Sequence, residues 1–88
     1  MLVRKIRNLR HKYNITINEL AQGSKRSPAW VSAIELGESS LREHTKETAL
    51  HGLKAVIASR RSALDALERD YYLHKDSLFD GAKEGSPL

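Results

Sequence analysis

The stretch Ile15–Gly37, ITINELAQGSKRSPAWVSAIELG, decides the fold. Its first helix signal is Thr16 followed three residues later by Glu19, a capping box in which side chains bind the first backbone N–H groups of a helix. Leu20 and the residue after it then carry apolar side chains inward. The run Gly23–Arg26 has turn composition. This half of the stretch predicts a helix over 16–23 and a turn after it.

The second half of the stretch carries a second helix start. Ser27 is a good N-cap, and Pro28 occupies the first helical position, where its missing N–H costs nothing. Gly37 is placed to end the helix in the left-handed conformation. A helix is therefore predicted over 28–36. Two short helices with this spacing have the dimensions of a helix-turn-helix.

A third helix is predicted before the stretch, over 2–13. Its apolar residues recur at spacings of three and four, as on one face of an amphipathic helix. Basic residues occupy its other faces. The apolar positions are Leu2, Ile6, Leu9 and Tyr13, and the basic ones are Arg4, Lys5, Arg7, Arg10 and Lys12. Three short helices with short links bury a core only by packing on one another, so the chain is expected to be all-α.

Over residues 4–38 the sequence resembles the lambda-repressor/Cro family, also called the Xre-type helix-turn-helix. The resemblance lies in an ordered, ungapped set of positions: Ile15-Thr16, Glu19-Leu20-Ala21, Ser27, Val31-Ser32, Ile34-Glu35 and Gly37. It implies a lambda-repressor-like bundle whose second unit helix enters the major groove of DNA. The chain departs from the family at Ile17, where Gln is usual, and at Pro28-Ala29, where polar residues often read bases.

The resemblance also implies which residues meet DNA. The groove-facing set and its flanks are Lys25, Arg26, Ser27, Pro28, Ala29, Trp30, Ser32 and Ala33, and the residues expected along the backbone are Arg7, Arg10 and Lys12. Arg26 could bind guanine with two hydrogen bonds or bind a phosphate. Trp30 could line the DNA boundary or be partly buried in the core. Glu35 is expected to pair with Arg10.

Charge is distributed unevenly along the chain, whose formal net charge is +4. Residues 1–30 contain seven Lys and Arg against one acidic residue, whereas residues 31–88 contain eight basic and ten acidic residues. The first part therefore favours a polyanionic partner. A merely solvated basic surface is the alternative.

The second half predicts one long helix, or two nearly collinear ones, beginning near residue 41 after the S-x-x-E box that Ser40 opens. Steps of three and four link a heptad seam of Leu50, Leu53, Ile57, Arg60, Leu64, Leu67, Tyr71, His74 and Leu78. Its first part is expected to close the core. Its later part, with Leu64, Leu67, Tyr71 and Arg60, is expected to dimerise, the alternative being a helix that folds back on its own domain. The predicted organisation is a domain over 1–58, a dimerisation helix over 59–79 and a flexible tail over 80–88.

Other classes of function find little support in the sequence. There is no cysteine, the histidines lack metal-ligand spacing, and no catalytic motif occurs, so we expect no metal, no cofactor and no enzyme. No apolar run is long enough for a membrane span, and a cytoplasmic protein is expected. The leading hypothesis is a homodimeric repressor that binds an inverted-repeat operator in double-stranded DNA. The alternatives are a protein-interaction module of antitoxin or anti-repressor type and a non-specific DNA binder.

Overall fold

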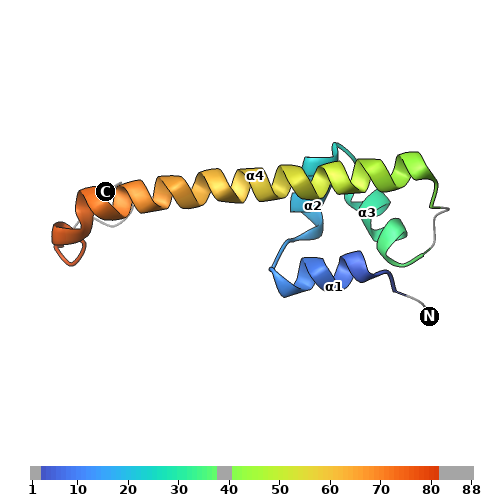
Figure 1. Ribbon diagram of the computed structural model, residues 1–88. Coiled ribbons are helices and arrows are strands. Elements are labelled where there is room, and N and C mark those ends of the chain that lie inside the picture. Colours follow the sequence, from blue (N-terminus) through green and yellow to red (C-terminus); the bar gives the residue numbers. More distant parts are fainter. Residues whose placement is uncertain (1–2, 38–40, 82–88) are drawn as a thin grey trace. The chain divides into compact units, whose positions relative to one another are not determined.

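The computed structural model describes residues 3–37 and 41–81, which form helices joined by turns (Figure 1). The all-helical prediction is thus confirmed for these residues. The elements are α1 (Lys5–Lys12), α2 (Ile17–Ser24), α3 (Pro28–Glu35), the long α4 (Glu43–His74) and a 3-10 turn, η1 (Lys75–Ser77). The chain divides into two units, Met1–Ala58 and Ser59–Leu88.

Both predicted N-caps are present. The Thr16 hydroxyl accepts a hydrogen bond from the backbone N–H of Glu19 at 3.0 Å, and the Ser27 hydroxyl accepts one from the N–H of Trp30 at 3.1 Å. Pro28 occupies the first turn of α3. Each cap satisfies a donor that the helix itself leaves unpaired. The starts of α2 and α3 are therefore encoded locally.

The ends of the helices differ in detail from the prediction. α2 continues through Gly23 to Ser24, and Lys25 takes the left-handed conformation that ends it, with φ 57°. Gly37 is left-handed after α3, with φ 73°, as predicted. α4 begins at Glu43, two residues later than expected, and Ser40 of its predicted capping box lies outside the described residues.

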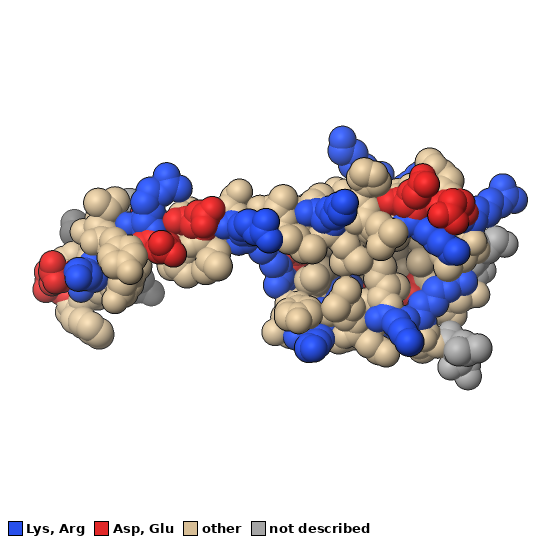
Figure 2. Space-filling view, in the orientation of Figure 1, with Lys and Arg blue, Asp and Glu red and all other residues tan. Residues whose placement is uncertain are grey.

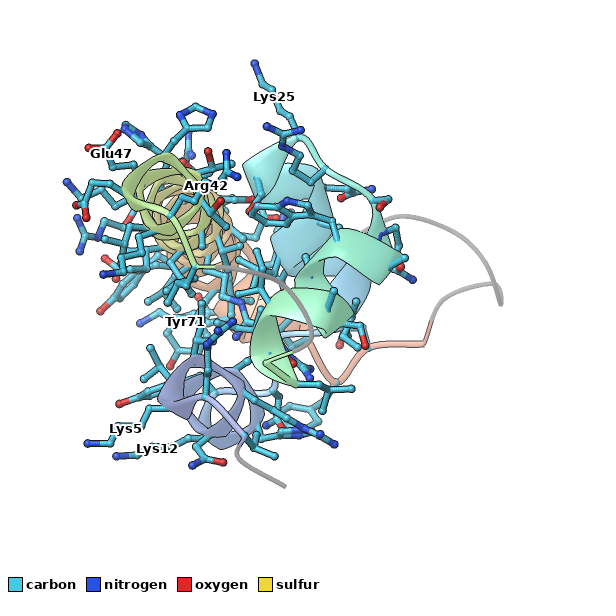
Figure 3. All side chains as sticks on the ribbon, turned by 90° about the vertical axis from the view of Figure 1, so that its right-hand side faces the viewer. Lys5, Lys12, Lys25, Arg42, Glu47 and Tyr71 are labelled. Atoms are coloured by element: carbon cyan, nitrogen blue, oxygen red, sulfur yellow. The ribbon has the colours of Figure 1, made fainter. Side chains whose placement is uncertain are left out.

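The core of the first unit lies among α2, α3 and the first part of α4. Its buried members are Ile15, Leu20, Ala21, Val31 and Val56, and the half-buried residues packed against them are Ile6, Ile17, Trp30 and Leu53. Figure 3 shows α1 and α4 on one side, with α2 and α3 beside them. The helices are short, so this shared apolar cluster holds them together more than their own propensity does.

The predicted register of α4 on the core was partly wrong. Leu50 and Ile57 are 58% and 51% exposed, whereas Ala49, Gly52 and Val56 are buried. The reason is the close approach of α2 and α4: a Cβ atom added at Gly23 would lie 2.7 Å from the carbonyl oxygen of Gly52. At this distance only small side chains fit, and the larger leucine and isoleucine are turned outward.

The second half of α4 is a continuous helix that carries the predicted seam as far as His74, whereas the dimerisation helix was predicted to reach residue 79 and Leu78 lies beyond the end of α4. Leu64, Leu67 and Tyr71 are all more than half exposed, and every side chain from 57 to 73 is exposed. Asp80 and Gly81 at the start of the predicted tail are exposed, and residues 82–88 lie outside the described part. An exposed row of large apolar side chains on one helix face is unusual for an isolated chain.

Candidate nucleic-acid interface

The two faces of α3 differ sharply in burial. Val31, Ile34 and Glu35 are buried against the rest of the first unit. Ala29 is exposed, and Ser32 and Ala33 are half-exposed on the other side of the helix. Burial of every third or fourth residue follows from the helical period. α3 therefore presents an outer surface of small side chains.

The turn before α3 carries two exposed cations. Lys25 extends into solvent from the end of α2 (Figure 3). The Arg26 guanidinium lies over the Trp30 ring, with its carbon 5.6 Å from the ring centroid, within cation–π range. The backbone N–H of Arg26 donates to the carbonyl of Ala21 at 3.0 Å. Both backbone and side chain thus hold Arg26 at the start of α3.

Trp30 is half-buried and packs against the core cluster. It also lines a small pocket together with Leu20, Ile34 and Ala49. Of the two interpretations of Trp30, this position supports a partly buried core residue. Its ring still reaches the outer surface, where Arg26 covers it.

A groove of about 460 Å³ borders the outer surface of α3. Each of the three short helices contributes to it: Arg7 and His11 from α1, Asn18 from the first turn of α2, and Ser32 from α3. Arg7 Nε donates to His11 Nε2 at 3.4 Å. The first N–H groups of a helix carry partial positive charge, so the start of α2 and Arg7 make the groove attractive to an anion.

Arg10 and Glu35 form a buried ion pair beneath this groove. Nε and Nη2 of Arg10 bind the two carboxylate oxygens of Glu35 at 2.7 and 3.0 Å, and Nη1 donates to the Ile15 carbonyl at 2.9 Å. The hydrogen bonds to Glu35 raise the pKa of Arg10 above its ordinary value, although burial acts against this. The predicted pair with Glu35 is present. The alternative role of Arg10 at a DNA phosphate is corrected, because its side chain is buried and its donors are engaged.

The prediction that Lys12 lies beside Arg7 along the DNA backbone is also corrected. With Lys5 it borders a different groove, of about 650 Å³, lined by Ile6, Leu9, Leu50 and Leu53 on the side of α1 that faces α4. Figure 3 shows Lys5 and Lys12 extending together from α1. Lys5, Leu9 and Lys12 share one face of the helix because they are four and three residues apart. Arg7 lies on another face, so the structure does not bring Lys12 together with Arg7.

Basic side chains do not form one continuous patch on the face of the first unit that Figure 2 shows. Figure 2 shows Lys and Arg side chains distributed over the first unit, with acidic side chains interspersed. The candidate interface is defined by the outer surface of α3 and by the starts of α2 and α3. Two residues of the groove, His11 and Asn18, were not predicted from the sequence. The position of Asn18 directly after a capped helix start was the available signal.

Neither a membrane helix nor a metal cluster is found in the described ranges. No helix there is long and apolar enough to cross a bilayer, and no three metal-ligating side chains gather in residues 3–37 and 41–81. Comparisons with protein-family models, with curated proteins and with solved structures found no match to this chain.

Proposed function

We propose that this chain is a homodimeric repressor that binds a specific sequence in double-stranded DNA through α3. The observation that carries the proposal is the outer surface of α3, which is bordered on one side by Lys25 and Arg26 and on the other by the groove that contains Arg7. Cations and helix N-termini at both borders are suited to phosphates on either side of a groove.

In this proposal the N-terminal half of α3 enters the major groove. Arg26 binds guanine O6 and N7, or a phosphate at the groove edge. Ala29 and Ala33 lie four residues apart on the outer surface and offer methyl groups to thymine methyls. Ser32 between them can donate a hydrogen bond to a base. Small side chains let the helix backbone approach the base edges closely.

The groove between α1 and α2 would take a backbone phosphate. Arg7 supplies positive charge, and the N–H groups and amide of Asn18 lie in the first turn of α2 beside it. Contacts of this kind position a protein on the duplex without reading its sequence. Because Arg10 and Glu35 form the floor of the groove, their pair would hold its two walls at the right separation.

Dimerisation supplies the second half of the binding site. The exposed side chains Leu64, Leu67 and Tyr71 share one face of α4, and burying such side chains gains about 1.5–3 kcal/mol each. A two-fold dimer reads an inverted repeat, with half-sites about 34 Å apart along the DNA. A cytoplasmic location belongs to the same proposal.

Selection of bound sequences from random duplexes tests this function. We expect one enriched motif with two-fold symmetry, and a binding constant whose logarithm falls linearly with the logarithm of salt concentration. Binding with no enriched motif would indicate a non-specific DNA binder. The proposal is overturned if the full-length chain shows no salt-dependent binding to any duplex.

A protein-interaction function is the second candidate, and the groove between α1 and α4 favours it. Leu9 and Leu50 are exposed there, with Lys5 and Lys12 at the border. An apolar groove with basic borders suits an acidic amphipathic segment. The double change Leu9→Ser and Leu50→Ser tests whether this groove contributes to DNA binding, since it alters the groove but leaves the outer surface of α3 unchanged. If the variant still binds DNA normally, the α1–α4 groove has no part in DNA binding.

A further inference from the structure

We propose that two copies of this chain pair through α4 in antiparallel directions, with Leu64 of each facing Leu67 of the other. The inference rests on the homodimer of the proposed function and adds the direction of the helices. It is drawn from the charged side chains in and beside the apolar seam, because apolar contacts alone do not determine direction.

The heptad positions in the second half of α4 are unambiguous. Leu64 and Tyr71 occupy one seam position, and Arg60 and Leu67 occupy the other, three residues away in each heptad. All four side chains are exposed on one face of a continuous helix. Flanking positions border such a seam and set the direction in which partner helices pair.

A parallel pair places like charges together. Each seam residue then faces its own copy, so Arg60 would meet Arg60 of the partner subunit inside the contact. Two guanidinium groups brought together while losing water repel each other. In a parallel pair the flanking partner of Glu68 is Ala63, and that of Arg61 is Val56, so neither charge gains an opposite charge.

An antiparallel pair removes this conflict. When Leu64 faces the partner's Leu67, Arg60 faces the partner's Tyr71, whose ring accepts a cation and whose hydroxyl accepts a hydrogen bond. Arg61 then lies beside the partner's Glu68. Two-fold symmetry repeats each of these contacts. The apolar pairs lie at the centre of the contact, and the charged and aromatic pairs flank them.

The register is determined by the same charges. Shifting one antiparallel helix by a heptad in one direction places Glu68 beside Glu68 of the partner subunit. Shifting it in the other direction places Arg61 beside the partner's Arg61. Either one-heptad shift therefore places like charges beside each other at the edge of the seam. Of these three registers, the one centred between Leu64 and Leu67 is the one that leaves opposite charges together.

Distances between spin labels test the direction in which the two helices pair. Because the sequence contains no native cysteine, each introduced cysteine is the single labelling site in its chain. Asp65→Cys and Tyr72→Cys are one heptad apart and exposed on the same side of α4. In the antiparallel pair the two labels at 65 are nearly level, whereas those at 72 are displaced along the axis by about 20 Å, from 13 residues at 1.5 Å each. We expect a clearly longer distance at 72 than at 65.

Each other outcome has a distinct meaning. Equal distances at the two positions would overturn the antiparallel inference and leave the dimer standing. The lack of any distance between copies, with operator binding retained, would overturn the pairing through α4 without overturning DNA binding. Circular dichroism of the labelled variants checks that the helix is intact.

Charge reversal gives a second test that does not use labels. Arg61→Glu alone and Glu68→Arg alone should each weaken the dimer by about tenfold, because two flanking pairs become repulsive. The double variant should restore the dimer dissociation constant in sedimentation equilibrium. No recovery in the double variant would contradict the antiparallel flank, and Arg69→Glu, on the outer side of the helix, is the matched control.

Discussion

Arg10 and Glu35 lie 25 residues apart and form a two-point ion pair that is almost fully removed from water, with exposed fractions of 6% and 2%. The pair joins α1 to the end of α3. Nearby, the backbone N–H of Arg4 donates to the Glu35 carbonyl at 2.9 Å, and the Arg4 side chain binds the Ile34 carbonyl. An ion pair and hydrogen bonds thus join α1, and Arg4 directly before it, to the end of α3.

Breaking this pair from one side should destabilise the protein strongly. Arg10→Met leaves a buried carboxylate without its partner, which costs about 3–5 kcal/mol. Urea unfolding followed by circular dichroism measures the loss. The double variant Arg10→Met and Glu35→Leu should recover part of the stability, because no charge is then buried alone. Equal stability of Arg10→Met and wild type would contradict the buried pair.

The contact between α2 and α4 should not tolerate a methyl group at its glycines. Gly52→Ala ordinarily gains about 1 kcal/mol of helix propensity, but here the new Cβ would meet Ser24. Gly23→Ala would meet the Gly52 carbonyl. Both variants are expected to lower the melting temperature. Ser59→Gly, at an exposed position of α4, is the control for propensity alone and should change stability by less.

Substitution of Ser24, unlike that of the two glycines, is expected to stabilise the protein. Its hydroxyl is buried and has no hydrogen-bond partner within the described residues. An unpaired buried hydroxyl costs about 1–3 kcal/mol, so Ser24→Ala should raise the free energy of unfolding. Thermal unfolding of the variant checks the sign. A loss of stability would show that the hydroxyl finds a partner in solution.

Arg26→Ala should weaken operator binding while leaving the fold intact. Loss of a guanine contact costs about 1–3 kcal/mol, and loss of a phosphate contact would instead lower the salt dependence of binding by about one charge. Fluorescence anisotropy at several salt concentrations separates the two. Lys12→Ala removes a cation from the other side of α1 and should change binding less. Comparable losses in both variants would contradict the assigned interface.

Leu64→Glu should convert the dimer to monomers in analytical ultracentrifugation, because it places two carboxylates in the middle of the apolar seam. The helix itself should persist in circular dichroism. Ser62→Glu, two residues away and off the seam, should remain dimeric. A dimer that survives Leu64→Glu would show that copies associate elsewhere.

The sequence predicted those parts of the fold that are encoded by neighbouring residues. Thr16 and Ser27 cap helices because their hydroxyls reach an N–H three residues away, and Gly37 ends a helix because it adopts a positive φ at little cost. The pairing of Arg10 with Glu35 came from the resemblance. None of these required knowledge of how the helices cross.

The errors arose at positions whose burial depends on the packing of one helix against another. Hydrophobicity favoured Leu50 and Ile57 over Ala49 and Gly52 as core positions of α4. Gly23 and Gly52 allow α2 and α4 to approach closely. At this short distance the small residues of α4 are buried, and Leu50 and Ile57 are exposed. Gly23 was interpreted as the end of its helix because glycine is typical of turns, whereas α2 continues to Ser24. The placement of Lys12 failed because basic residues surround most of α1, so charge alone does not select a face.

The first unit draws its last core residue from Val56, and the remainder of α4 contributes nothing to that core. The segment of α4 that completes the core of the first unit and the segment proposed to pair with a second copy are therefore different parts of one helix. Under the proposed pairing, substitutions after Ala58 are expected to change association while leaving the core of the first unit intact.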